Sequence, residues 1–93
     1  MSDVSPSAVL SRRDLPWRDV AGEVVVLDHE GRRILGLNKT GGAVWKSLDG
    51  SRSLADVAAE LASRYGRELA TVEQDVLAFA RLLLDRDLVA PAA

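Results

Sequence analysis

The first half of the chain has the short apolar runs of β-strands. Residues 23–28 read EVVVLD and are rich in β-branched side chains, which favour strands. Residues 32–37 form a second run, and the three residues 29–31 between them are too few for a crossover, so the two strands should be antiparallel. A shorter strand is expected over residues 17–20, followed by a turn at 21–22. These runs predict an N-terminal three-stranded antiparallel sheet.

The second half has the spacing and the end signals of amphipathic helices. Either Asn38 or Thr40 should cap a first helix that Gly50 stops, because their side-chain oxygens can accept hydrogen bonds from the free amides of a first turn. A second helix should begin at Ser53 and end at Gly66. The predicted fold class is therefore α+β, with the three-stranded sheet followed by three helices.

The third of these helices is unusually apolar. It is expected over residues 72–86, with a capping box formed by Thr71 and Gln74. Residues 76–84 read VLAFARLLL, in which Arg81 is the one charged residue. A surface helix needs a single apolar stripe, so a helix that is apolar nearly all round is either central or one wall of a binding groove. The two roles are compatible, since one stripe can face the core while a flank faces a ligand.

The amino-acid composition argues against several classes of protein, including disulfide-bonded, nucleic-acid-binding and membrane-spanning ones. The 93 residues suit one small domain, residues 1–93, in which we expect residues 1–7 to be disordered. The chain has no cysteine, which excludes disulfides and thiolate chemistry. Its 12 basic and 14 acidic residues give a net charge of −2, without the basic footprint of a nucleic-acid-binding protein. No apolar run could span a bilayer and no signal pattern is present, so cytoplasmic residence is expected.

No arrangement of residues points to catalysis or metal binding. The single histidine, His29, lies in a predicted turn without a second ligand at metal spacing. Asp85 and Asp87 should lie on a solvated helix end, and no set of Ser, His and acid can be drawn. Gly41 and Gly42 lack the context of a phosphate loop and should instead let the first helix approach the sheet closely. We therefore expect no catalytic residue, no metal and no cofactor.

A winged-helix DNA-binding regulator is the alternative function. The short connection over residues 66–70 contains a glycine and joins two helices that follow another helix, as in a helix-turn-helix. A recognition helix should present Arg, Lys, Asn or Gln to base edges, whereas the third helix presents mainly Leu and Ala. Its first turn is also acidic, at Glu73 and Asp75, which would repel phosphate. A sheet edge beside an apolar helix is better suited to capturing an extended peptide.

One set of residues resembles the PqqD-like family and spans about residues 16–89. The set comprises Val25-Val26-Leu27-Asp28, Gly31, Leu37-Asn38-x-Thr40-Gly41, Trp45 and Leu48-Asp49-Gly50, followed by Leu54, Val57, Leu61, Tyr65, Asp75-Val76, Phe79, Leu82 or Leu83, and Leu88-Val89. The resemblance implies a winged helix-turn-helix-like fold with three N-terminal strands and three helices. It also implies a RiPP recognition element, where RiPP denotes a ribosomally synthesised, post-translationally modified peptide.

The function implied by this resemblance is that of a non-enzymatic adaptor. Such proteins bind the leader segment of a precursor peptide by strand addition and present the precursor to a modifying enzyme. That enzyme is a radical SAM enzyme for PqqD itself and a leader protease in lasso-peptide biosynthesis. We expect neither nucleic acid nor a membrane as a partner of this chain. Carried over by position, the leader-binding residues are Arg32, Arg33, Ile34, Leu35, Gly36, Asp75, Ala78, Phe79 and Leu82.

Three further expectations concern single positions. Trp45 should be structural, because the apolar residues of its helix must cover the sheet. Arg32 and Arg33 should guard the strand edge against self-association and favour an acidic leader. Many relatives have an aromatic residue where Ile34 stands, so the leader residue that this chain prefers can differ from theirs.

Overall fold

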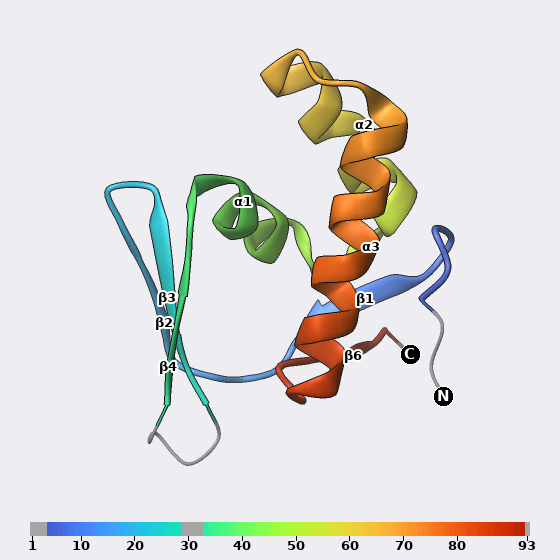
Figure 1. Cartoon of the computed structure of the whole chain (residues 1–93). Coiled ribbons are helices and arrows are strands. Elements are labelled where there is room, and N and C mark those ends of the chain that lie inside the picture. Colours follow the sequence, from blue (N-terminus) through green and yellow to red (C-terminus); the bar gives the residue numbers. More distant parts are fainter. Residues whose placement is uncertain (1–3, 29–32, 93) are drawn as a thin grey trace.

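Two antiparallel sheets and three helices form the part of the chain that the computed structural model describes, residues 4–28 and 33–92 (Figure 1). The strand order is β2-β3-β4 in one sheet and β5-β1-β6 in the other. The α+β class, the N-terminal three-stranded sheet and the three helices are confirmed, while the winged-helix likeness stays a prediction. In chain order the elements are β1 (Val9–Arg12), β2 (Trp17–Val20), β3 (Glu23–Leu27), β4 (Ile34–Leu37), α1 (Lys39–Ser47), β5 (Asp49–Ser53), α2 (Leu54–Tyr65), α3 (Leu69–Asp85) and β6 (Val89–Pro91).

The sheet β5-β1-β6 was not predicted. It joins strands from the two ends and the middle of the chain, with Val9 opposite Ser53 and Leu10 opposite Pro91. The segment expected to be disordered leads into it: the carbonyl of Pro6 accepts a hydrogen bond from the N–H of Ala55, at 2.8 Å. Pro6 is thus held at the start of α2, and residues 1–3 lie outside the described part.

Helix α1 lies close against the sheet β2-β3-β4. Gly42 makes this approach possible, because a Cβ at this position would lie 2.9 Å from Cγ2 of Val24. Asn38, and not Thr40, caps the helix, since its Oδ1 accepts from the N–H of Gly41 at 2.8 Å. The predicted stop at Gly50 is wrong: α1 ends at Ser47, and Gly50 lies in β5 with φ of +84°.

The second helix has the predicted ends and the third does not. Ser53 caps α2 through the N–H of Asp56, and Gly66 ends it in the left-handed conformation. Helix α3 begins at Leu69, and its N-terminal neighbour Glu68 makes no side-chain cap. The expected capping box at Thr71 and Gln74 is therefore wrong, because the hydroxyl of Thr71 bonds Oε1 of Glu68 at 3.2 Å and lies inside the helix.

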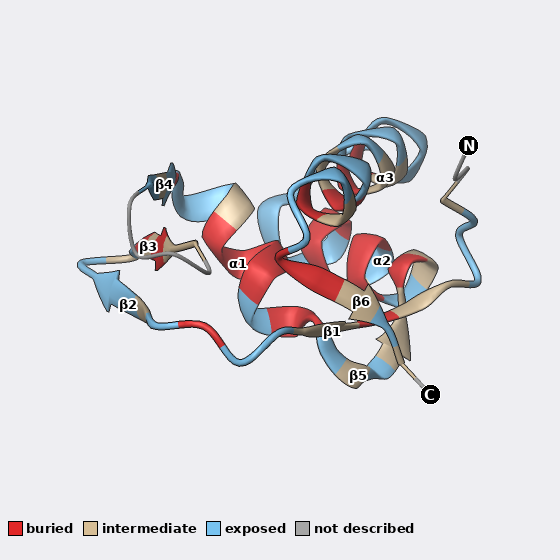
Figure 2. Ribbon diagram, turned by 90° about the horizontal axis from the view of Figure 1, so that it is seen from below, coloured by how far each residue is buried: buried red, intermediate tan, exposed pale blue. Residues whose placement is uncertain are grey.

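The core lies between the helices and both sheets, as the buried segments of Figure 2 show. Trp45 is fully buried, which confirms its predicted structural position. Helix α3 has both of the properties considered for it: one stripe is buried, and the flank that carries Ala78 and Leu82 is exposed. No helix among the described residues is long and apolar enough to cross a membrane. The buried stripe of α3 consists of Val72, Val76, Ala80 and Leu83.

Candidate functional site

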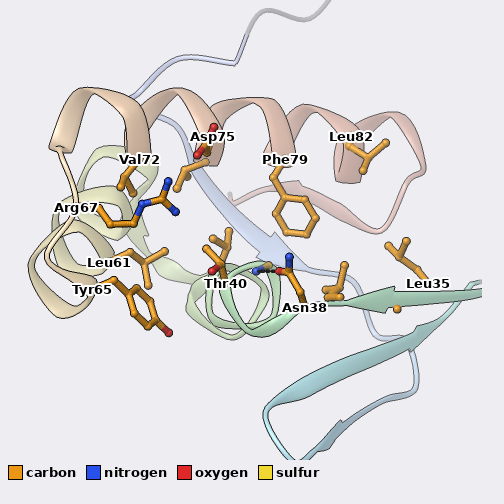
Figure 3. A pocket seen from close by; sticks show the side chains of 15 residues that line it. Leu35, Asn38, Thr40, Leu61, Tyr65, Arg67, Val72, Asp75, Phe79 and Leu82 are labelled. Carbon is orange, nitrogen blue, oxygen red and sulfur yellow. Dashed lines mark hydrogen bonds between the residues drawn. The ribbon is translucent and has the colours of Figure 1, made fainter.

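A cavity of about 440 Å³ opens where β4, the first turn of α1, the end of α2 and one face of α3 meet (Figure 3). Its walls are mostly apolar, with polar groups from Asn38, Thr40, Tyr65, Arg67 and Asp75. The lining residues are Leu35, Gly36, Leu37, Asn38, Thr40, Gly41, Val44, Leu61, Tyr65, Arg67, Val72, Asp75, Val76, Phe79 and Leu82.

Helical spacing explains the α3 wall of this cavity. Val72, Val76, Phe79 and Leu82 follow one another at intervals of three or four residues, and Asp75 is three residues after Val72 and four before Phe79, so all five share one face of the helix. Phe79 stands in the middle of this face and is half-buried. The α3 wall therefore presents an apolar surface with one carboxylate on it.

The opposite wall begins with β4, which is an edge strand. Its one partner in the described sheet is β3, with Leu35 opposite Val26 and Leu37 opposite Val24. The N–H of Asp28 donates to the carbonyl of Arg33 at 3.1 Å, so these two residues form a hydrogen-bonded pair. Hydrogen-bonded and non-bonded pairs alternate along an antiparallel ladder. The residues of β4 that bond to β3 are therefore Leu35 and Leu37.

The same alternation leaves the backbone groups of Ile34 and Gly36 on the free edge. Each residue has one N–H and one C=O that point away from β3, toward the side on which α3 lies. Side chains alternate as well, so Leu35 faces inward and lines the cavity. Ile34 faces outward, and its side chain is 69% exposed. An unpaired backbone edge thus runs beside an apolar cavity.

The first turn of α1 continues this wall beyond the end of β4. Asn38 fixes the start of the helix directly after the strand, so Thr40 and Gly41 face the cavity. A Cβ on Gly41 would lie 3.6 Å from Cζ of Phe79, which shows how near α1 comes to α3 here. Together, β4 and α1 form one continuous wall opposite α3.

Five of the nine expected leader-binding residues line the cavity: Leu35, Gly36, Asp75, Phe79 and Leu82. The structure places three others elsewhere. Arg33 lies in a neighbouring hollow that also contacts Leu35 and Asp85, Ile34 is on the outer face of the sheet, and Ala78 is an exposed α3 residue outside the lining. Arg32 lies outside the described residues, as does the turn residue His29.

The sequence interpretation missed the part of the cavity that α2 contributes. Tyr65 was named among the residues that carry the family resemblance but not as a site residue, and Arg67 was not singled out at all. Both lie beside Gly66, at the connection between α2 and α3 (Figure 3). No local pattern marks them, because the packing of α2 on α3 brings them to the cavity.

The lining favours binding of apolar side chains over reaction chemistry. Asp75 is the single carboxylate among its residues, and the remainder are apolar apart from the groups named above. In the described residues no group of three or more His, Cys, Asp or Glu side chains could hold a metal ion. The arrangement offers main-chain hydrogen bonds on one wall and an apolar surface on the other.

Comparison with known proteins identifies one family and three solved structures of the same fold. The family model described as "Coenzyme PQQ synthesis protein D (PqqD)" matches residues 23–89. Among curated proteins, none matches this chain by sequence.

Three solved structures share the fold. The PqqD truncation of Methylobacterium extorquens PqqCD, described as a functional, stand-alone RiPP recognition element, is 26% identical with a TM-score of 0.78, covering 94% of this chain and 94% of its own. Lasso peptide synthetase B1, complexed with the leader peptide, is 27% identical with a TM-score of 0.78 over 90% of this chain and 100% of its own. TbiB1, in complex with the TbiA(beta) leader peptide, is 24% identical with a TM-score of 0.76, covering 85% of this chain and 93% of its own.

Proposed function

Because this chain belongs to the PqqD family, we propose that it is a RiPP recognition element. It acts as a non-catalytic adaptor that binds the leader segment of a ribosomally synthesised precursor peptide and presents the precursor to a modifying enzyme. Two relatives with the same fold have been solved with leader peptides, one of them 27% identical to this chain.

The observation that carries the proposal is the free edge of β4 beside the apolar cavity. An extended peptide would pair with the outward N–H and C=O groups of Ile34 and Gly36. Its side chains would alternate, so every second one would point toward the cavity and pack against Phe79 and Leu82. Main-chain hydrogen bonds would then supply affinity, and the cavity would supply specificity for particular leader side chains.

The remaining expected residues have narrower roles in this proposal. Arg33 lies at the start of the edge and Ala78 lies beside the α3 wall, where they would contact the rim of the bound leader. Arg32 precedes Arg33 in the sequence and would contact the same part of the leader. Ile34 and Gly36 act through their backbone groups, and Asp75 acts from the α3 wall. Arg33 contributes little by charge alone, because an exposed ion pair is worth about 0 to 1 kcal/mol.

The proposed partners are the leader and one enzyme. That enzyme is either a leader protease or a radical SAM enzyme, and the genes beside this one distinguish the two. Neither nucleic acid nor membrane takes part in the proposal. An adaptor for a newly translated precursor would act in the cytoplasm.

A titration with the leader of a precursor gene near this one tests the proposal. Labelled protein is followed by amide chemical shifts as leader is added, with a scrambled leader as control. We expect shifts at Ile34, Gly36, Phe79 and Leu82 with the leader and none with the scrambled peptide. Shifts concentrated on α2, with the β4 edge unchanged, would contradict the site, and no shift at all would contradict the function.

A further inference from the structure

The cavity extends farther along the protein than β4 does. The strand ends at Leu37, whereas the lining continues past Thr40 and Leu61 to Arg67 at the α2–α3 connection. This connection leads into the N-terminal end of α3 (Figure 1), whereas Asp85, which lines the neighbouring hollow with Arg33, ends the same helix. A peptide that pairs with β4 and continues along α3 would therefore leave the strand edge and enter a region walled by helices.

Arg67 is the positively charged residue at this end of the cavity. Its backbone is held in place, since its N–H donates to the carbonyl of Ala62 at 3.0 Å directly after the left-handed Gly66. From this anchor its side chain extends into the cavity (Figure 3). The α2–α3 connection thus fixes the point from which the side chain of Arg67 enters the cavity.

Arg67 has no acidic partner among the described residues. Other cations of the chain do have one: Arg13 pairs with Asp87 at 2.7 Å, and Lys46 pairs with Asp19 at 2.6 Å. Asp75 also lines the cavity, yet it makes no ion pair with Arg67. The guanidinium is therefore available to a ligand.

Its surroundings suit an acidic ligand group. The apolar side chains of Leu61 and Val72 lie beside it in the cavity (Figure 3), so a bound peptide would exclude water and strengthen an ion pair. The first turn of α1, which contains no acidic residue, adds the positive end of a helix dipole to the same cavity. A guanidinium also binds a carboxylate through two parallel hydrogen bonds, which makes the contact directional.

We infer that Arg67 determines the specificity of this cavity by pairing with an acidic side chain of the bound peptide. The acidic residue belongs to the segment next to the one that adds to β4, where the peptide passes the first turn of α1. This inference rests on the proposed function and narrows it: the ligand is a peptide with an apolar, strand-forming segment and an Asp or Glu at a fixed distance from it.

A randomised peptide library, displayed on phage, tests the inference without knowledge of the natural leader. It is selected in parallel against the wild-type protein, Arg67→Glu and Arg18→Glu. Arg18 is the matched control, because it is exposed on β2, outside the cavity, and its replacement changes the net charge equally. Circular dichroism first establishes that all three proteins are folded, and Arg67→Gln replaces Arg67→Glu if the latter is not.

We expect the wild-type protein and Arg18→Glu to enrich peptides with an acidic residue at one position relative to the apolar segment. Arg67→Glu should lose that preference or exchange it for Lys or Arg, and Arg67→Gln should bind the enriched acidic peptides about 3- to 10-fold more weakly. Equal acidic enrichment by wild-type protein and Arg67→Glu would overturn the inference while leaving the proposed function standing. Failure of the wild-type protein to enrich any peptide would overturn the proposed function itself.

Discussion

Trp17 packs edge-on against Trp45, with ring centroids 6.3 Å apart and ring planes at 80°. This contact ties β2 to α1, and Arg12 of β1 extends it. The guanidinium of Arg12 lies 5.4 Å from the Trp17 ring centroid, and its Nη1 donates to the carbonyls of Trp45 and Lys46 at 3.0 and 2.8 Å. The two sheets are thus joined through the end of α1, the helix whose first turn lines the cavity.

Replacement of Trp45 should therefore act on stability. Trp45→Ala removes a fully buried indole and should lower the free energy of unfolding by about 3 to 5 kcal/mol. Urea denaturation followed by circular dichroism measures this change. An unchanged melting temperature together with lost peptide binding would instead make Trp45 a ligand contact.

Replacement by alanine should affect protein stability differently at two glycines. Gly42→Ala would bring Cβ within 2.9 Å of Val24, and overpacking of this kind costs about 1 to 3 kcal/mol, which outweighs the helix preference for alanine. Gly36→Ala meets no atom within 4 Å and should leave the stability of the free protein nearly unchanged. Thermal melts of both variants provide the comparison, and equal melting temperatures would show that α1 can shift away from β3.

The backbone role of Ile34 can be separated from its side chain. Ile34→Pro removes an N–H on the free edge while leaving the hydrogen bonds of β4 to β3 intact, so leader affinity should fall at least about tenfold. Ile34→Ala keeps the N–H and should change affinity little, because the side chain faces away from the cavity. Isothermal titration calorimetry measures both. A larger loss for Ile34→Ala would place the leader on the outer face of the sheet.

Adjacent leucines on α3 should have different roles. Leu82 is 40% exposed at the cavity, so Leu82→Glu should weaken leader binding by about 1 to 2 kcal/mol while the protein stays folded. Leu83 is fully buried, and Leu83→Glu should unfold the protein. Circular dichroism and leader titration of the pair test this, and an unfolded Leu82→Glu would assign Leu82 to the core.

Titrations with leader and with duplex DNA at several salt concentrations distinguish the adaptor from the DNA-binding alternative. Strand hydrogen bonds and apolar packing should make leader affinity depend weakly on salt, whereas duplex DNA would bind with a steep loss of affinity as salt rises. Salt-sensitive duplex binding without leader affinity would replace the proposed function with that of a regulator.

Asp19 should titrate below the ordinary range. Hydrogen bonds from the Lys46 ammonium and the N–H of Gly22 lower its pKa. Because the folded-state pKa is below the unfolded-state value, the stabilisation is present above the unfolded-state pKa and is lost as pH falls through the folded-state pKa. Carboxyl-carbon NMR titration should show a lowered pKa that rises in Lys46→Met. An unchanged value in that variant would remove Lys46 as the cause.

Local signals in the sequence predicted the elements that depend on neighbours along the chain. Ser53 was predicted as a cap and Asn38 as one of two candidate caps, and the side-chain oxygen of each accepts a hydrogen bond from the N–H three residues later. The sheet β5-β1-β6 has no such signal, since β5 reads DGSRS and pairs with residues that are 38 to 44 positions away along the chain. Tertiary packing alone reveals that sheet.

The residues of the candidate site also differ in whether the sequence could predict them. Asp75, Phe79 and Leu82 were carried over by position from the family resemblance, and all three line the cavity because they share one helical face. Tyr65 and Arg67 were missed because their place at the cavity depends on how α2 packs against α3. Ile34 was predicted by position, but the alternation of the strand turns its side chain outward.

The shortness of β4 has a kinetic consequence. Two outward residues provide two N–H and two C=O groups, and at about 0.5 to 1.5 kcal/mol each their hydrogen bonds amount to about 2 to 6 kcal/mol. Association alone costs about 4 kcal/mol or more, so the edge cannot retain a peptide without the cavity. Weak retention appears as fast dissociation, because affinity differences lie mainly in the off-rate. On the β4 edge alone a leader would have a short residence time, so the contacts in the cavity set how long it stays bound.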